Sequence, residues 1–485
     1  MYTVGYGERL SVSNIHSIER GRLKQGSLGV RQLTFFVIAA AAPLTILVGF
    51  TPLALIYGGP ITATGFVVAG CTYLLFSVIF TAMSRYVVNS GAFYSYIHAG
   101  LGIEPAAAAA VVAYLAYAMC QIGFCSVAGL FVASALTEFL GMHMPWYLCA
   151  AVLALLSGML SYRRVNVGAR VMGVLMLLEI GIMLWLAICI LRVGGHEGLS
   201  NSGSLSLTGM LSPRFGAAYA CALLAFVGFE QTAIYSEEAK DPTRTVMIAT
   251  YVAVIFLTVF YTVMFWAFYM GIGPSRLATV LAGDVSRLVF DLAAGYIGKS
   301  LTQLLELLVI TSFFAGVMAL QNASTRYLFS VARDGLLPPA LARVSPTTGV
   351  PSVATVSQTV LTVIAILMFA ATGADPYTQI LVWTNTPPLI AVLVLQAATA
   401  AAGFCFFGRM GEQPRAVGIG TRVVAPVAAI LVLTGSLGTI LANFGLLTGK
   451  GFWGNFAILS PLIVGGLAGY LRGVVLRRRK CLEIA

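Results

Sequence analysis

Two glutamates, Glu179 and Glu230, lie inside long apolar stretches and are the acidic residues best placed to do chemistry there. A charged carboxylate in apolar surroundings is costly unless it is paired or hydrogen-bonded. Glu179 is therefore either a group that exchanges a proton or a neutral acid bonded to a backbone carbonyl. Glu230 is either a proton-linked or gating group, or a structural hydrogen bond that ties its segment to neighbouring segments.

Helix-breaking residues occur in two apolar stretches. Pro43 removes an amide donor and clashes with the preceding turn, so its helix must kink or unwind nearby. Gly228 lies in the second stretch, two residues before Glu230, and both stretches contain Val-Gly-Phe, at 48–50 and 227–229. A proline kink without function is the alternative for the first stretch, and Gly49 is a rival position for its break. Paired interruptions favour two broken helices.

A broken helix offers binding groups, because its free amides attract anions and its free carbonyls attract cations. We therefore predict a binding site at the two interruptions, formed by Ala42, Pro43, Leu44 and Thr45 in the first and by Ala225, Phe226, Val227 and Gly228 in the second. Phe226 is either a lid over the ligand or a packing residue. Gln121 is alone in an alanine-rich stretch, where its amide contacts either the ligand or another helix.

Other polar residues favour structural roles. Asn322 is expected to bond a neighbouring helix, Glu306 to lie near an interface, and Glu237 and Glu238 to pair with nearby basic side chains. The eight cysteines and four histidines are scattered, so neither a disulfide framework nor a metal site is predicted, and no cofactor is expected. Phosphate-loop and nucleophile-elbow motifs are absent, which argues against an ATP-driven pump, a kinase or a hydrolase.

The composition defines the elements that must hold these residues. Of 485 residues, 59% are hydrophobic and only 9% are charged, whereas soluble domains have roughly 45–50% apolar and about 25% charged residues. The chain is therefore predicted to be an all-α integral membrane protein. Its net charge of +11 reports orientation in the membrane and does not indicate nucleic-acid binding.

A bilayer core of about 30 Å requires about 20 apolar residues per helix, and twelve stretches qualify. They lie at about 33–57, 61–84, 106–135, 146–162, 166–192, 215–236, 245–272, 301–331, 353–372, 377–402, 423–445 and 453–475. We expect a cytoplasmic segment at 1–32, a ten-helix core at 33–402, two peripheral helices at 403–475 and a basic cytoplasmic tail at 476–485. The loop at 273–300 is expected to contain a short surface helix.

Basic residues predict the orientation of these spans. With the N-terminus inside, 22 of the 28 Lys and Arg residues fall on the inner side and 6 on the outer side. Because positive charge concentrates on the cytoplasmic side, both termini are predicted to be cytoplasmic. The segment before the first span lacks the features of a signal peptide.

Three stretches resemble the amino acid–polyamine–organocation (APC) superfamily of permeases. They are Gly228–Glu230 with Ser236–Arg244, Asn322–Arg326 with Ala332–Pro338, and Ser90–Ile97 leading into Gly100–Gly102. The resemblance implies two inverted five-helix repeats plus two extra helices, with spans 1 and 6 unwound in mid-membrane. It also implies that span 1 binds the substrate's carboxylate and span 6 its amino group. Many members have Gly-x-Gly in span 1, where this chain has Pro43-Leu44-Thr45.

The predicted function is secondary active transport of an amino acid or related amine across the plasma membrane. Spans 1, 2, 6 and 7 would rock against a scaffold that includes spans 3, 4, 8 and 9, and substrate would be clamped between 42–45 and 225–228. Glu230 and Glu179 are the candidates for proton coupling, and Glu179 falls near the place on span 5 where some relatives carry a basic residue. The expected partners are the substrate, protons and the lipid bilayer.

Several alternatives stay open. Substrate exchange or sodium-coupled symport could replace proton symport, because Thr311, Ser312 and backbone carbonyls offer oxygen ligands for sodium. A channel or a sensor is the alternative from a different class of protein, although no selectivity-filter loop is evident. An enzyme is disfavoured because histidines are few. The identity of the substrate and the oligomeric state are not predicted.

Overall fold

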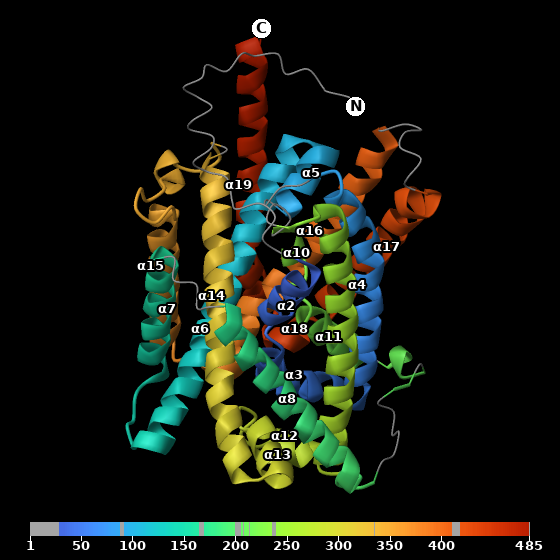
Figure 1. Cartoon of the computed structure of the whole chain (residues 1–485), viewed down its shortest axis with the longest axis vertical. Helices are drawn as coiled ribbons and strands as arrows, with labels where there is room; N and C mark the ends of the chain where they lie inside the picture. Colours follow the sequence, from blue (N-terminus) through green and yellow to red (C-terminus); the bar gives the residue numbers. More distant parts are fainter. Residues whose placement is uncertain are drawn as a thin grey trace.

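The computed structural model describes residues 29–87, 92–163, 169–198, 205–206, 208–212, 214–234, 239–333, 335–409 and 418–484, and every regular element within these ranges is a helix (Figure 1). The helices of the first half are α2 (Val30–Ala40), α3 (Pro43–Gly58), η1 (Gly59–Ile61), α4 (Thr62–Ser84), α5 (Phe93–Leu101), α6 (Ile103–Leu140), α7 (Trp146–Tyr162) and α8 (Ala169–Val193).

The second half follows the same pattern of long helices joined by short ones. Its elements are η2 (Thr208–Leu211), α9 (Phe215–Leu224), α10 (Gln231–Ile234), α11 (Pro242–Ile272), α12 (Leu277–Leu281), α13 (Leu288–Ile297), α14 (Lys299–Arg333), η4 (Pro339–Ala342), α15 (Ser352–Ala371), η5 (Pro376–Ile380), α16 (Leu381–Arg409), η6 (Gly420–Val424), α17 (Ala425–Ala442), α18 (Phe444–Thr448) and α19 (Phe452–Ile484). The loop at 273–300 thus holds two short helices, α12 and α13.

Nine helical segments in the described part of the chain are long and apolar enough to cross a membrane. One of them, Pro43–Ser84, contains the first two predicted spans, because α3, η1 and α4 follow one another without an intervening loop. Two further predicted spans fall on shorter apolar helices, Trp146–Tyr162 and Phe215–Leu224. The protein is therefore a multi-pass helical membrane protein.

Helix α6 lies at the centre of the scaffold and packs most extensively against α14 and α19. The contact with α19 is close because glycines on α19 face the alanine-rich start of α6. A Cβ atom at Gly469 would lie 2.8 Å from the Ala107 carbonyl oxygen, and one at Gly473 would lie 2.8 Å from the Glu104 Cα atom. Small residues on both helices, the glycines of α19 and the alanine run at 106–110 of α6, allow the two backbones to approach this closely.

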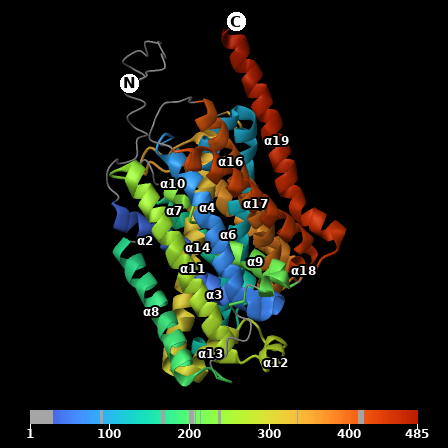
Figure 2. The same cartoon turned by 90° about the vertical axis from the view of Figure 1, so that its right-hand side faces the viewer.

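A second group of helices surrounds α3. Helix α4 packs against α11, and α9 lies against both α3 and α4; Figure 2 shows α3, α4 and α11 side by side. All residues of α3 except Ile56 and Tyr57 are buried. Since α3 is enclosed on every side by protein, its N-terminal turn lies inside the bundle.

Aromatic side chains fill the end of the bundle beside α13. The ring of Phe131 on α6 lies 5.7 Å from that of Phe290 on α13 and 5.5 Å from that of Phe313 on α14. Tyr377, at the start of η5, donates a hydrogen bond of 2.7 Å to the carbonyl of Val48. These contacts join α6 to α13 and α14, and η5 to α3, at the α13 end of the bundle.

Helix α11 begins with a side-chain cap at the other end of the bundle. Asp241 accepts hydrogen bonds from the amides of Thr243 and Arg244, at 3.1 and 3.2 Å, as N-cap aspartates commonly do. The hydroxyl of Thr243 and then the amide of Arg244 lower the pKa of Asp241. The cap fixes where α11 starts after the short helix α10.

Candidate functional site

The helix predicted over 33–57 is divided between α2 and α3. Ala41 lies in a turn, and Ala42 has φ 43° and ψ 66°, in the left-handed region that alanine rarely adopts. Pro43 opens α3, and the carbonyl of Ala42 accepts the first helical bond, from the amide of Ile46 at 3.1 Å. We call residues 41–42 the first break. Gly49 lies within α3, where an added Cβ would meet the Phe313 ring at 3.1 Å.

The first break leaves donors at the start of α3. The first amides of a helix have no partner within the helix, and Pro43 has no amide hydrogen to offer. The amides of Leu44 and Thr45 therefore remain as donors at a positive helix end. Both residues are buried, with exposed fractions of 1% and 0%, so these donors face the protein interior.

The helix predicted over 215–236 is divided between α9 and α10. Residues 225–230 form successive turns, in which the amide of Phe226 bonds the carbonyl of Leu223 and the amide of Phe229 bonds that of Phe226. Gly228 has φ +117°, which only glycine adopts without strain. We call residues 225–230 the second break. Glu237 and Glu238 lie outside the described residues.

The two breaks lie beside each other. Helix α3 packs against α9, and α2 packs against α10, so the breaks fall between two pairs of contacting half-helices. Figure 1 shows α2, α3 and α10 together in the middle of the bundle. Ala225, Phe226 and Gly228 are buried and Val227 is partly exposed.

Glu230 holds the second break in shape. Its side chain is fully buried, its Oε2 atom accepts the Gly228 amide at 2.9 Å, and its Oε1 atom accepts the Tyr117 hydroxyl at 2.8 Å. Tyr117 belongs to α6, and its ring stacks on that of Tyr327 from α14 at 5.6 Å. Within the described part of the chain, no ion pair includes Glu230. The carboxyl group therefore joins the broken helix to the scaffold through neutral donors.

Aromatic packing surrounds Phe226 and Phe229. The ring of Tyr73 on α4 lies 5.1 Å from that of Phe226 and 5.0 Å from that of Phe229. The Tyr73 hydroxyl donates a bond of 3.0 Å to the carbonyl of Leu223, the second-last residue of α9. Phe226 also meets Tyr261 of α11 edge to face at 6.1 Å. In this arrangement Phe226 packs between α4 and α11.

Glu179 is linked through Ser312 to the first turn of α3, next to the first break. Its Oε2 atom accepts the hydroxyl of Ser312 at 2.9 Å, and the oxygen of Ser312 accepts the hydroxyl of Thr45 at 3.1 Å. The side chain of Glu179 is buried, with 6% of the residue exposed. A chain of two hydrogen bonds thus connects a carboxyl on α8, a hydroxyl on α14 and the first turn of α3.

Gln121 belongs to a group of buried amides in the scaffold. Its nitrogen donates to Gln321 Oε1 at 2.6 Å, and its oxygen accepts from the nitrogen of Gln358 at 2.9 Å. Gln321 also donates to the Thr355 carbonyl and the Thr359 hydroxyl. We call Gln121, Gln321 and Gln358 the amide cluster; it joins α6, α14 and α15. The structure therefore places the Gln121 amide in contacts between helices.

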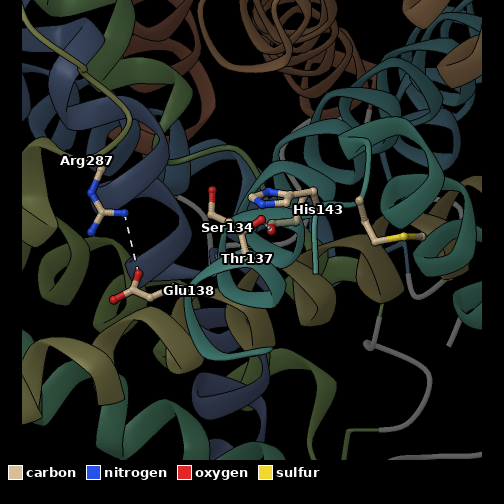
Figure 3. A pocket seen from close by; sticks show the side chains of 7 residues that line it. Ser134, Thr137, Glu138, His143 and Arg287 are labelled. Carbon is tan, nitrogen blue, oxygen red and sulfur yellow. Dashed lines mark hydrogen bonds and ion pairs between the residues drawn. The ribbon is translucent and has the colours of Figure 1, made fainter. Parts of the chain in front are cut away.

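Asn322 and Glu306 also bond neighbouring elements. Asn322 accepts the hydroxyl of Ser161 on α7 at 2.9 Å, and Glu306 accepts a bond of 3.3 Å from Arg287. Arg287 also lies 3.8 Å from Glu138, at the edge of a surface pocket of about 360 Å³ that includes His143 (Figure 3). This pocket lies at the α13 end of the bundle and contains none of the predicted site residues.

Tyr73 and Tyr117 were not identified from the sequence, although Tyr73 bonds the end of α9 and Tyr117 bonds Glu230 in the second break. Each is one of 20 tyrosines, and its partner lies more than 100 positions away along the chain. A polar ring in a span at the same depth as Glu230 is a weak signal that could have suggested them. No cluster of metal-ligating side chains occurs among the residues that the structure describes.

Comparison with known proteins identifies the family. A family model described as "Amino acid permease" matches residues 28–467, which is most of the chain. The protein belongs to this permease family. The predicted resemblance to APC permeases is therefore confirmed, and the protein is a permease rather than an enzyme.

Two relatives of this permease come from Bacillus subtilis (strain 168). The branched-chain amino acid permease BcaP is 23% identical over 348 residues, which cover 68% of this chain and 71% of the relative. A methylthioribose transporter is 26% identical over 309 residues, which cover 60% of this chain and 64% of the relative. The names of the two relatives specify different substrates, branched-chain amino acids and methylthioribose.

Proposed function

We propose that this permease is a proton-coupled secondary transporter that moves an amino acid or a related small molecule across the plasma membrane by alternating access. The family supports transport of this class of substrate. The hydrogen-bonded chain Thr45–Ser312–Glu179 is the observation that carries the coupling, because it links a titratable group to the turn of α3 that offers amides to substrate.

The membrane topology of this proposal has twelve crossings. Nine long segments are present among the described residues, and dividing Pro43–Ser84 at η1 gives ten spans. The helix Trp146–Tyr162 and the broken α9–α10 helix then bring the total to twelve. The first helix of each five-helix half is then the broken one, which is the arrangement of inverted-repeat transporters. Both termini lie in the cytoplasm, 33–402 is the transport core, and the α13 end faces outward.

Substrate binds between the two breaks. Its carboxylate, where it has one, accepts hydrogen bonds from the amides of Leu44 and Thr45, since a helix N-terminus attracts anions. Its amino or hydroxyl groups face the carbonyls freed at Ala225 and Val227. Helices that carry the breaks then move against the scaffold held by the amide cluster.

Protonation of Glu179 changes what its carboxyl group can bond. An ionised carboxylate only accepts hydrogen bonds, whereas a protonated one also donates. The change alters the link through Ser312 to Thr45 and hence the position of α3 relative to α8 and α14. Glu230 is the second proton-coupling residue, faced by Tyr73 from α4, by Tyr117 and Cys120 from α6, and by Tyr327 from α14.

Uptake by the purified permease in liposomes tests this proposal. A panel of labelled amino acids, amines and methylthioribose is offered with and without an inwardly directed proton gradient, in buffers with and without sodium. We expect accumulation that follows the proton gradient and does not require sodium. Glu179→Gln should abolish accumulation while binding persists, and Glu306→Gln, a carboxyl change near the α13 end, should not.

The alternatives give different results in the same experiment. If the permease is an exchanger, uptake requires substrate inside the liposomes and does not depend on the proton gradient. Sodium symport requires sodium, for which the oxygens of Thr45, Ser312 and Glu179 would be ligands. A channel gives steady conductance without saturation, and a sensor binds without uptake. If the Glu179→Gln variant still accumulates substrate as the wild type does, proton coupling does not depend on Glu179.

A further inference from the structure

Four glutamines among the residues that the structure describes are fully buried. Gln121, Gln321 and Gln358 bond one another in the amide cluster. The fourth, Gln396 on α16, differs: in the described part of the chain neither its nitrogen nor its oxygen has a hydrogen-bond partner. Its side chain is as buried as the other three, with an exposed fraction of 0%.

An unpaired amide is unusual in such a position. A glutamine side chain carries two donor hydrogens and an acceptor oxygen, and buried polar groups in proteins are nearly always bonded. Membrane interiors offer no solvent to compensate. The three bonded glutamines show that this bundle can satisfy buried amides, whereas Gln396 is left without a hydrogen bond to the described residues.

Gln396 lies beside Tyr73, whose ring contacts the second break. The hydroxyl of Tyr73 lies beside its amide, but this hydroxyl donates to the Leu223 carbonyl, and no bond of acceptable geometry joins the two side chains. The ring of Tyr73 also contacts Phe226 and Phe229. Tyr73 thus lies beside both the unpaired amide and the aromatic side chains of the second break.

Further buried hydroxyls without a partner among the described residues lie on the helices around Gln396 and Glu230, and Thr399 and Tyr327 are two of them. Thr399, one turn further along α16, is buried without a partner among the described residues. The hydroxyl of Tyr327 on α14 is also unpaired within these residues, although its ring stacks on Tyr117, the hydrogen-bond donor to Glu230. Uncharged donors and acceptors thus lie on two helices near the second break.

We propose that Gln396 determines substrate specificity by hydrogen-bonding a neutral polar group, a hydroxyl or a carboxamide, on the substrate side chain. The inference rests on the proposed transport function. An amide can donate to and accept from such a group, whereas an apolar side chain leaves it unpaired and a charged one would require a counter-charge. The substrate class is therefore amino acids with neutral polar side chains, such as threonine or asparagine, in preference to valine or leucine.

Threonine and valine provide the test because their side chains have nearly the same shape. Uptake of labelled threonine by permease in liposomes is competed with unlabelled threonine or valine, for the wild type, Gln396→Leu and Gln396→Met. We expect the wild type to prefer threonine, and both variants to lose about tenfold in the threonine-to-valine ratio, equivalent to about 1.4 kcal/mol. Their thermal stability should match or exceed that of the wild type, because no bond within the protein is lost.

Gln358→Leu is the matched control, because it removes an equally buried amide whose partners lie in the protein. It should lower thermal stability and leave the threonine-to-valine ratio unchanged. If the wild type takes up no member of the wider panel, the proposed function fails. If the wild type prefers valine, or if both Gln396 variants keep the wild-type threonine-to-valine ratio, the inference about Gln396 is wrong while the proposed transport function still stands. Loss of stability in both variants, as in Gln358→Leu, also overturns it, by showing that Gln396 is bonded within the protein.

Discussion

The amide cluster and the second break are both buried and polar, but their hydrogen bonds are distributed differently. In the cluster, Gln121, Gln321 and Gln358 bond each other across three long helices. At the second break, Glu230 bonds the backbone of its own segment, while Gln396 nearby stays unpaired among the described residues. A satisfied network fixes the positions of its helices, whereas free groups beside a broken helix are available to a ligand. In the proposed mechanism, this difference distinguishes the scaffold from the substrate site.

The largest expected effect comes from filling the second break. Gly228→Leu places a side chain at φ +117°, a conformation that leucine cannot adopt without strain. The break should change shape and binding should fall below detection, which thermal stabilisation by substrate would measure. Gly181→Leu is the control, because nothing lies within 4 Å of a Cβ added there. Unchanged affinity in Gly228→Leu would mean that substrate binds elsewhere.

Replacing Glu230 with glutamine tests the two hydrogen bonds of its carboxyl group while keeping the size of the side chain. In Glu230→Gln only one oxygen remains, so the side chain can no longer accept from both Tyr117 and the Gly228 amide. We expect proton-driven accumulation to fall by more than about tenfold while part of the binding remains, as measured by uptake and binding on the same preparation. Tyr117→Phe removes one bond and keeps the carboxyl group, so it should have the smaller effect. Full accumulation in Glu230→Gln excludes its role in coupling.

The amide cluster should respond in stability rather than in transport. Gln321→Leu leaves the Gln121 nitrogen without its acceptor, and an unsatisfied buried polar group costs about 1–3 kcal/mol. Thermal unfolding in detergent should shift downward, and substrate selectivity at a permissive temperature should match that of the wild type. A change in selectivity without loss of stability would place the cluster in the binding site and remove the distinction between the two regions.

A single bond at the edge of the scaffold should matter least. Ser161→Ala removes the donor to Asn322, and one ordinary hydrogen bond contributes about 0.5–1.5 kcal/mol. Unfolding should shift slightly and uptake should stay at the wild-type rate. Asn322→Leu, which instead leaves Ser161 without its acceptor, serves as the comparison. Loss of uptake in either folded variant would indicate that Asn322 contributes to transport.

Local chemistry made the break positions predictable. Pro43 lacks an amide hydrogen and Gly228 lacks a Cβ atom, and both properties are visible in the sequence without knowledge of the fold. The helical class followed from composition in the same way. The number of long helices was harder to predict, because η1 continues directly from α3 into α4 and α7 has only 17 residues.

Hydrogen-bond partners were not predictable, because they depend on which helices meet. Gln121 lies 200 positions from Gln321 and 237 from Gln358, so the sequence alone could not show which of two interpretations, contact with substrate or with another helix, applies to its amide. The chain from Thr45 through Ser312 to Glu179 likewise joins three helices far apart in sequence. Gln396 showed no signal at all, because its distinguishing property is the lack of partners in a folded environment.

Helix α19 offers a fixed point for measuring motion. Its 33 residues make a rod of about 50 Å, longer than the hydrocarbon core of about 30 Å, and Figure 2 shows its last turns standing clear of the bundle. Arg472 donates to the carbonyl of Gly335 and Arg477 to Glu104, which attach this rod to the scaffold. A spin label or dye on α19, paired with one on α2, would therefore measure the movement that we propose for the broken helices, with α19 as the reference.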